Sequence, residues 1–421
     1  MKPILLIFLF GLISITGISQ NTPISPFKLV DEAKRNLNYL KPVKVLRDSA
    51  ELYLNTDYEG YYYQALSTYQ SYAGDYFGAL KSYDKAFGRG KANKVDSTED
   101  IKILPAAPLI YEKARKSQLL ILNEAHHVAL HRAFAASLLD SLYAMGYRYF
   151  AVETLLYTDD KLAERGYPIE GSGTYTIEPT FGNLIRKAAA VGFKFIAHEV
   201  RDDQEMEIED WKKRSNFRDS IMAVNVNAVL EADENAKVFM YVGYDHLQEQ
   251  EKDGIKRMAY FLKRNYGIDP FTIEQTEYTE KGSRKHESYM YEYVAGKIEA
   301  PSVVYTNGSL YKSKRYADLV DLQIFHSRTR FKSDRPDWLF KYLLMKPFSV
   351  YISDFKEQEI IVQAYYQQEL NEEEHPVPLD HIAVTDHEST VSLALPAKPS
   401  GSLIIQIRDI ENQVLREVGV D

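Results

Sequence analysis

The chain has no cysteine in its 421 residues, which excludes disulfides, thiolate metal sites, a cysteine nucleophile and a lipid anchor on a cysteine. It also has no long run of lysine or arginine, and its formal net charge is −9. This acidic balance argues against a nucleic-acid partner, because a general nucleic-acid binder needs a basic face. Beyond the first 20 residues, no stretch reaches about 18 uninterrupted apolar residues. We therefore expect no transmembrane segment in the mature chain.

The first 20 residues, MKPILLIFLFGLISITGISQ, differ from the rest of the chain. One lysine precedes an apolar run from Ile4 to Ile15, which is too short for a comfortable membrane span, and small and polar residues follow. This order predicts a secretory signal peptide over residues 1–20, cleaved near Gln20, with an uncleaved anchor as the alternative. We expect a periplasmic or secreted protein that relies on its hydrophobic core instead of disulfides.

Two modules are predicted to flank a central domain. Residues 21–100 favour a helical module, in which YYQALSTYQSYAGDYFGALKSYDKAFG resembles one tetratricopeptide-type (TPR-like) helical pair with a turn near Gly74 and Asp75. A single pair cannot bury its own faces, so we expect it to pack on the next domain. Residues 346–421 hold short β-rich segments separated by turns, a pattern typical of a small β-sandwich. Either module is a candidate surface for a protein partner.

Between these modules, residues 101–345 alternate short apolar segments with amphipathic ones. SQLLILNEA, YRYFAVET, FKFIAHE and AKVFMYVGYDH are predicted strands, each followed by a predicted helix. PFTIEQT is a further predicted strand, and PSVVYT, residues 301–306, is expected to supply the last one. Such repeating strand–helix units predict an α/β domain with a mainly parallel sheet, whose ligands bind outside the carboxyl ends of the strands.

Polar residues recur at the carboxyl ends of four of these predicted strands. They are Asn123, Glu124, His126 and His127 after the first strand, Glu153 after the second, His198 and Glu199 after the third, and Asp245 and His246 after the fourth. Because these ends share one edge of the sheet, the side chains are predicted to meet in one cleft. Structural roles stay open for single members: Glu124 can cap the following helix, and only one of the adjacent His198 and Glu199 is expected to face the cleft.

At these residues the chain resembles a known family. NEAHHVALH and RYFAVE are similar to the Gly-Glu-x-x-His turn and the next strand of the erythromycin-esterase-like superfamily, and FRDSIMAVNV is similar to its Arg-Asp-x-x-Met-Ala-x-Asn helix. The matching residues are Glu124 and His127 in the turn, Glu153 in the strand, Arg218, Asp219, Met222, Ala223 and Asn225 in the helix, and His246 after the last strand. The resemblance implies attack of water on an ester or related bond. Asn123, His131 and Gly243 depart from the family pattern and put macrolide specificity in doubt.

The residues themselves favour general-base chemistry. Without cysteine and without a Gly-x-Ser-x-Gly elbow, a covalent nucleophile is poorly supported. A neutral imidazole can instead remove a proton from water when a carboxylate holds its tautomer. We expect His127 to be this base, oriented by Glu124 or Glu153, and Arg218 and His246 to stabilise the developing oxyanion. The residues predicted to contact a small-molecule substrate are His126, His198, Glu199, Tyr175 and Tyr244, with Tyr157 and Tyr167 in the same pocket.

No cofactor is expected for this chemistry, but two other interpretations stay open. Glu124, His127, Glu153 and His246 have donor types that suit zinc or manganese, although no His-Glu-x-x-His segment occurs and the ligands would come from separate strands. More distant relatives with a Gly-Glu-x-His turn include metal-dependent peptidases and haem-binding lipoproteins. With 32 tyrosines in the chain, a non-enzymatic haem or ligand carrier is therefore the third interpretation.

Overall fold

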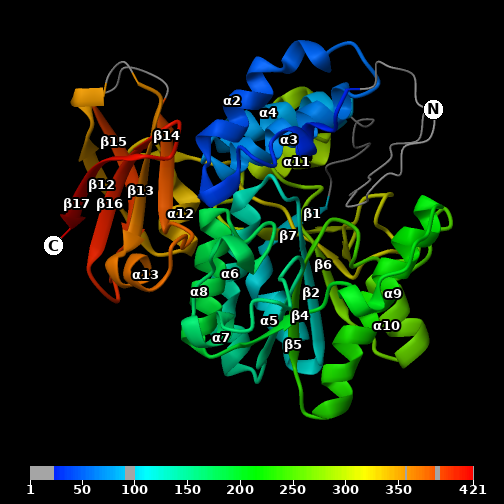
Figure 1. Cartoon of the computed structure of the whole chain (residues 1–421). Helices are drawn as coiled ribbons and strands as arrows, with labels where there is room; N and C mark the ends of the chain where they lie inside the picture. Colours follow the sequence, from blue (N-terminus) through cyan, green and yellow to red (C-terminus); the bar gives the residue numbers. More distant parts are fainter. Residues whose placement is uncertain (1–22, 91–99, 356–357, 385–388, 421) are drawn as a thin grey trace.

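The structure is a computed structural model that describes residues 23–90, 100–355, 358–384 and 389–420. The predicted signal peptide lies outside these residues. Within them, no helix is long and apolar enough to cross a membrane. The chain forms a mixed α/β structure, in which a helical module precedes a parallel sheet with flanking helices and antiparallel sheets follow it (Figure 1).

All six strands of the central sheet run parallel. Their order is β4 (Lys194–Ala197), β3 (Tyr149–Val152), β5 (Val238–Gly243), β2 (Leu119–Glu124), β6 (Phe271–Glu274) and β9 (Leu322–Gln323). The central strands β2 and β5 are buried along their whole length. Their nearly continuous apolar sequences suit strands whose two faces are both covered by helices. The prediction of an α/β fold with a mainly parallel sheet is confirmed.

Alternate residues of each strand point to opposite faces of this sheet. Leu120 and Leu122 of β2 belong to the core on one face, whereas Leu119 and Ile121 belong to the core on the other. The first face is covered by α5 (Ala106–Lys116), α6 (Ala129–Ala144) and α8 (Pro179–Val191), and the second by α9 (Trp211–Ala232) and α10 (Met258–Tyr266). This alternation decides which helix each side chain at a strand end meets.

One predicted strand joins a different sheet. PSVVYT forms β7 (Ser302–Thr306), which pairs antiparallel with β1 (Ile101–Pro105) and with β8 (Ser309–Leu310). The expectation that it extends the parallel sheet is wrong, because that place is taken by β9. An apolar run predicts that a strand forms, but the partner of the strand depends on packing with distant residues.

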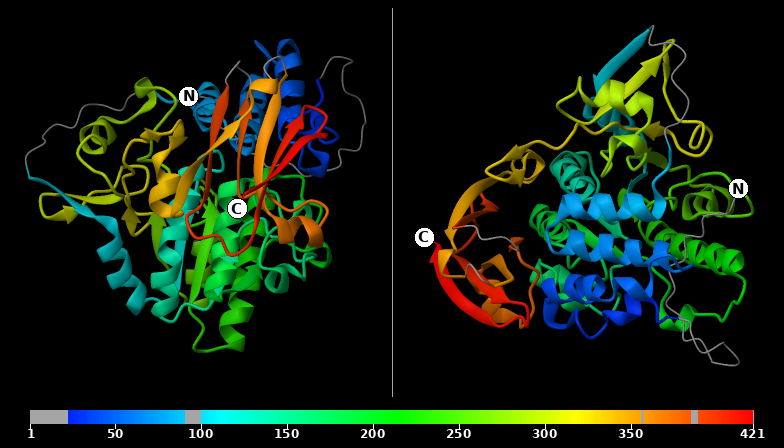
Figure 2. Two further views of the ribbon diagram at one scale, coloured as in Figure 1. Left: turned by 90° about the vertical axis from the view of Figure 1, so that its left-hand side faces the viewer. Right: turned by 90° about the horizontal axis from the view of Figure 1, so that it is seen from above.

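The N-terminal helical module lies across the carboxyl ends of the parallel strands (Figures 1 and 2). Its helices are α1 (Pro26–Leu29), α2 (Leu40–Asp48), α3 (Glu59–Tyr72) and α4 (Tyr76–Phe87). The turn between α3 and α4 forms where Gly74 takes a φ of 80° and the Asp75 side chain accepts the backbone N–H of Gly78. Tyr62 and Tyr69 of α3 share one hydrophobic core with the sheet, so the module packs on its neighbour.

The C-terminal module contains two antiparallel sheets and lies beside the helical layer of α6 and α8 (Figure 1). One sheet pairs β12 (Met345–Tyr351) with β15 (Thr390–Pro396), and the other has the order β14 (Asp380–Val384), β13 (Ile360–Tyr366), β16 (Leu403–Asp409) and β17 (Val414–Val420). Leu393 of the first sheet and Ile405 of the second share one core. The sequence analysis did not predict β17, most of whose side chains are exposed.

Short elements complete the described part of the chain. They are α7 (Leu162–Arg165), α11 (Tyr289–Ala295), β10 (Phe331–Lys332), β11 (Arg335–Pro336), α12 (Asp337–Tyr342) and α13 (Gln367–Glu372). Of these, α12 packs on α6 and leads into β12, and α13 follows β13. Both therefore lie where the central sheet and the C-terminal module meet.

Several buried histidines lack a full set of hydrogen bonds, among them His326 and His381. His326 Nε2 donates to Gln275 Oε1 at 2.8 Å, but its Nδ1 has no partner within the described chain. For His381 on β14, neither ring nitrogen has a hydrogen-bond partner in that part of the chain. Burial lowers the pKa of both imidazoles to about 3, from an ordinary value of about 6.5.

We expect these two histidines to make the fold sensitive to acid. Between pH 6.5 and about 3, the unfolded chain binds protons at both imidazoles and the folded chain does not. The free energy of unfolding therefore falls as the pH is lowered from 6.5 to about 3, whereas above pH 6.5 these two histidines cause no such loss. Urea denaturation at neutral and acidic pH should show a smaller loss for the double variant His326→Gln/His381→Gln than for wild type. The partly exposed His375→Gln controls for the substitution, and equal losses in all three proteins would contradict the prediction.

Candidate active site

The polar residues at the ends of β2, β3 and β5 lie together and are buried. Glu124 is 2% exposed, His126 6%, Glu153 4% and His246 7%. They form two halves, one on each face of the sheet, because residues two apart along a strand point to the same face. Glu124 lies on the face of Leu120 and Leu122, whereas Glu153 lies on the opposite face, that of Ala151. The cluster approaches solvent at Arg218 and Glu199, whose side chains are 30% and 18% exposed.

The first half is built on Arg132 of α6. Its Nε donates to Glu124 Oε2 at 2.8 Å and its Nη2 to Oε1 at 2.9 Å, while Nη1 donates to Glu178 Oε2 at 3.0 Å. Glu178 is the N-cap of α8, where it also accepts the backbone N–H of Phe181. Burial alone raises the pKa of Glu124, but Arg132 and His126 outweigh this and lower it to about 2. Glu124 is therefore a carboxylate at neutral pH.

His126 bridges the two halves. Its Nδ1 lies 2.9 Å from Glu124 Oε1, and its ring stacks on Tyr175 with centroids 3.8 Å apart. Because a carboxylate only accepts hydrogen bonds, Nδ1 carries the proton of the neutral ring, and Nε2 then has the lone pair. The Nε2 edge of the ring lies over Gly243 at the end of β5, next to Oε2 of Glu153. The arrangement is that of an imidazole base oriented by a carboxylate.

The second half is built on Arg218 of α9. Arg218 Nη2 donates to Glu153 Oε1 at 3.0 Å and to Glu199 Oε1 at 2.6 Å, and its Nε donates to Glu199 Oε2 at 3.0 Å. Burial raises the pKa of Glu153, but His246 and Arg218 outweigh it and hold the pKa well below its usual range. The backbone N–H of Gly243 also donates to Glu153. Glu153 is therefore charged, and it is held from three sides.

His246 is oriented by Asp219, one residue after Arg218 on α9. Its Nδ1 lies 2.6 Å from Asp219 Oδ1, which places Nε2 3.1 Å from Arg218 Nη1 and 3.6 Å from Glu153 Oε1. Burial lowers the pKa of His246, but Asp219 and Glu153 outweigh burial and raise it above its ordinary value. A ring held in this way can stabilise negative charge or donate a proton beside Glu153.

Backbone strain is stored at two positions of the same edge. Thr154, directly after Glu153, has a φ of 66°, and Tyr244, directly after Gly243, has a φ of 37°. Non-glycine residues rarely adopt positive φ, and such residues persist where surrounding contacts hold them. For Tyr244 the contact is visible, because its carbonyl accepts Asn123 Nδ2 at 2.7 Å. Asn123 therefore links the end of β2 to the turn after β5.

His127 does not join the cluster. Its ring stacks on Tyr83 of α4 with centroids 3.7 Å apart, and its Nδ1 lies 3.3 Å from the Tyr244 hydroxyl. Burial holds its pKa well below the ordinary value. His126 and His127 follow each other in the turn after β2 and point to different sides. The side of the carboxylates, which the sequence analysis gave to His127, is occupied by His126.

The set considered for a metal is likewise not brought together. Glu124, Glu153 and His246 lie near one another, but His127 faces the helical module. Across residues 23–90, 100–355, 358–384 and 389–420, no group of three or more His, Asp or Glu side chains is arranged to hold a metal ion. The four residues therefore do not fit a metal site in this arrangement.

The residues predicted to contact substrate are placed unevenly. Tyr175 stacks on His126, and Glu199 pairs with Arg218. Tyr244 lies between the rings of His126 and His127. His198 is fully buried close by, and its ring nitrogens have no hydrogen-bond partner among the described residues. Tyr157 is 40% exposed, and Tyr167 is not in this cluster but beside α13, where its hydroxyl donates to Glu372.

Sequence reasoning missed Arg132, Glu178 and the role of Gly243. Arg132 lies in the apolar helix segment LHRAFAASLL, where an arginine is costly to bury without a partner. Its position in the sequence therefore indicates a buried ion pair. Glu178 precedes a proline at a helix start, which predicts a cap but not an ion pair with α6. At Gly243, a side chain would meet His126 and Glu153, which the sequence alone does not reveal.

Replacing Gly243 by alanine is expected to disable the cluster. A Cβ there would lie 2.3 Å from His126 Cε1 and 2.8 Å from Glu153 Oε2, so one of these groups must move. Misplacing a catalytic group by about 1 Å can cost on the order of 100-fold in rate. We therefore expect any reaction rate that depends on this cluster to fall by roughly that factor in Gly243→Ala. Gly60→Ala, where the added Cβ meets nothing within 4 Å, is the matched control, and equal kcat in the two variants would refute the role of Gly243.

Comparisons with known proteins identify no family for this chain. No family model matches it, and no curated protein matches it. Among solved structures, it is similar to RRSP, a MARTX toxin effector domain from Vibrio vulnificus CMCP6, with 13% sequence identity and a TM-score of 0.30. The match covers 63% of this chain and 60% of the toxin domain. A likeness of this size carries no argument about fold or function.

Proposed function

We propose that this chain is an exported hydrolase related to the erythromycin-esterase-like superfamily, in which a His/Glu site activates water to attack an ester or related bond of a small molecule. One observation carries the proposal. The buried His126 has its Nδ1 on Glu124 and its Nε2 edge beside Glu153, with Arg218 and His246 adjacent. The proposal differs from the sequence-based expectation in its base, which is His126 and not His127.

In the proposed reaction, His126 Nε2 removes a proton from water while the water oxygen attacks the carbonyl carbon of the substrate. Glu124 stabilises the imidazolium that forms, and Glu153 orients the water. The oxyanion is stabilised by Arg218 and His246. As the carbonyl re-forms, the bond to the leaving oxygen breaks and that oxygen takes the proton from His126. The products are a carboxylic acid and an alcohol.

The flanking modules have finer proposed roles. We propose that α3 and α4 form a TPR-like pair, since they are joined by a tight turn and pack along each other. The two C-terminal sheets share one core, which supports a small β-sandwich. Both modules remain candidate surfaces for a protein partner. Export with cleavage near Gln20 rests on the sequence pattern alone.

A substrate screen tests the proposed function. The exported chain is assayed against aryl esters, alkyl esters and lactones, before and after dialysis against EDTA, with His126→Ala in parallel. The proposal requires hydrolysis that depends on His126 and survives chelation. Activity that is lost with EDTA and restored by zinc or manganese would favour the metal-dependent hydrolase or peptidase. A Soret band on titration with haem, without hydrolysis of any substrate, would favour a haem carrier.

A further inference from the structure

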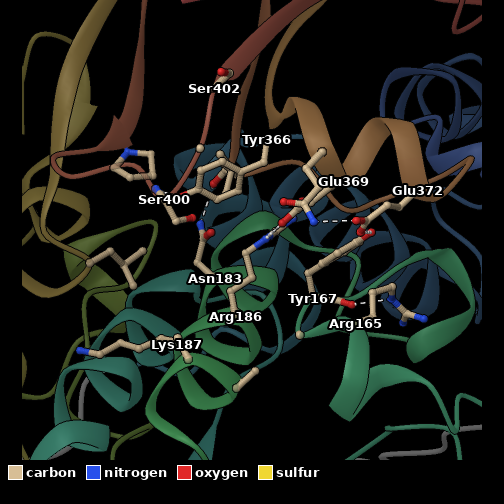
Figure 3. Close-up of a pocket in the computed structure, with 18 of the residues that line it drawn as sticks. Arg165, Tyr167, Asn183, Arg186, Lys187, Tyr366, Glu369, Glu372, Ser400 and Ser402 are labelled. Carbon is tan, nitrogen blue, oxygen red and sulfur yellow. Dashed lines mark hydrogen bonds and ion pairs between the residues drawn. The ribbon is translucent and has the colours of Figure 1, made fainter. Parts of the chain in front are cut away.

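A cavity lies away from the strand-end cluster, between the helical layer of the sheet and the C-terminal module (Figure 3). We propose that this cavity binds a neutral oligosaccharide. Such a site is separate from the proposed hydrolytic one, and it gives the C-terminal module a ligand-binding role that the proposed function does not require.

The cavity has the size and place of a ligand site. Its volume is about 630 Å³, within the range of about 300–1,000 Å³ that small-molecule sites occupy. Such sites form preferentially where two domains meet. Figure 3 shows the two walls: Asn183, Arg186 and Lys187 come from α8, and Tyr366, Glu369, Glu372, Ser400 and Ser402 come from the C-terminal module.

The charges in the lining cancel. Three cations, Arg165, Arg186 and Lys187, stand against three carboxylates, Glu164, Glu369 and Glu372. Each cation already has a carboxylate partner: Arg186 donates to both oxygens of Glu369, Arg165 lies 2.6 Å from Asp159, and Lys187 lies 2.8 Å from Asp140. An anionic ligand would find no uncommitted cation among these three. The lining therefore does not favour an anionic ligand.

The remaining lining groups suit a polyhydroxylated ligand. Tyr366 is partly buried, and its hydroxyl accepts the backbone N–H of Ser400 at 3.4 Å. An aromatic ring and hydrogen-bonding groups therefore lie side by side in the lining. Asn183 and Gln368 add amide oxygens, since their nitrogens donate to the Leu379 carbonyl and to Glu372, and Ser402 adds a hydroxyl. Tyrosine faces with neutral hydrogen-bonding side chains match the apolar faces and hydroxyls of a sugar.

Binding is tested by calorimetry on the exported chain with three probes: maltohexaose, cellohexaose and hexa-N-acetylchitohexaose. We expect at least one to bind with a Kd in the micromolar to millimolar range. Ala190→Trp, an exposed position of α8 that lines the cavity, should weaken this binding at least about tenfold by filling it. Gln368→Trp fills the cavity from the opposite wall and serves if the first variant is unstable. The matched control is Ala232→Trp, at an exposed position of α9 outside the cavity.

Three results would overturn the proposal. The first is the absence of binding by all three sugars at millimolar concentration. The second is binding that the cavity-filling variants leave unchanged, which would place the sugar elsewhere on the molecule. The third is tighter binding of hexagalacturonate than of the neutral sugars, which would contradict a neutral site. None of these measurements uses hydrolysis, so a failure of sugar binding can be distinguished from a failure of the proposed enzyme activity.

Discussion

Replacing His126 by alanine is expected to lower kcat by roughly 100-fold or more, because positioned general bases contribute about that much. His126 is the imidazole whose Nδ1 is held by Glu124 and whose Nε2 edge lies beside Glu153. KM should change little, since the ring acts on water and not on the substrate in the proposed reaction. Steady-state kinetics on a substrate found in the screen give both parameters. The stack of His126 on Tyr175 is lost in this variant, so a thermal melt must show that it is folded.

The neighbouring residue provides the control for this prediction. His127→Ala removes a ring of the same kind, equally buried, from the side that faces Tyr83. We expect it to lower the melting temperature through the lost stack but to retain most of kcat. The opposite outcome, with full kcat in His126→Ala and a large loss in His127→Ala, would return the base to His127. The sequence resemblance would then be a better guide than the geometry of the turn.

Replacing Arg132 by methionine is expected to destabilise the fold by about 3–5 kcal/mol, the usual result of removing one partner from a buried ion pair. Arg132 is fully buried and holds both Glu124 and Glu178, so the substitution leaves two buried carboxylates without their cation. The free energy of unfolding from urea denaturation measures the loss. Adding Glu124→Gln and Glu178→Gln to the variant should restore part of it, because the uncompensated charges are then removed.

An exposed ion pair is the matched comparison. Arg330 pairs with Glu299, and their side chains are 66% and 78% exposed. Arg330→Met should change the free energy of unfolding by no more than about 1 kcal/mol, since solvent screens such pairs. If Arg132→Met cost no more than this control, the Arg132 network would contribute little to stability and its role would be confined to orienting Glu124.

Much of the central fold was open to prediction because local patterns report local structure. The apolar segments that became β2, β3, β4 and β5 each precede an amphipathic helix, and this order alone predicts a parallel sheet. The polar residues that end these strands were placed at one edge for the same reason, and Glu124, Glu153, Arg218 and His246 do lie together there. The segment that became β7 was correctly predicted to be a strand, but it pairs with β1 and not with the parallel sheet.

The sequence by itself determined the strand–helix order and the residues that stand at the strand ends, because side-chain periodicity and the absence of cysteine can be read without knowing any contact. Only the tertiary structure decided which of the two adjacent histidines joins the carboxylates, and which groups hold them. Arg132 and Glu178 are 46 residues apart, and Glu153 and Gly243 are 90 apart. Contacts over such separations depend on how helices pack on opposite faces of the sheet. The turn after β2 has no periodicity from which the direction of His126 or His127 follows, so their assignment needed the positions of Tyr83, Tyr175 and Gly243.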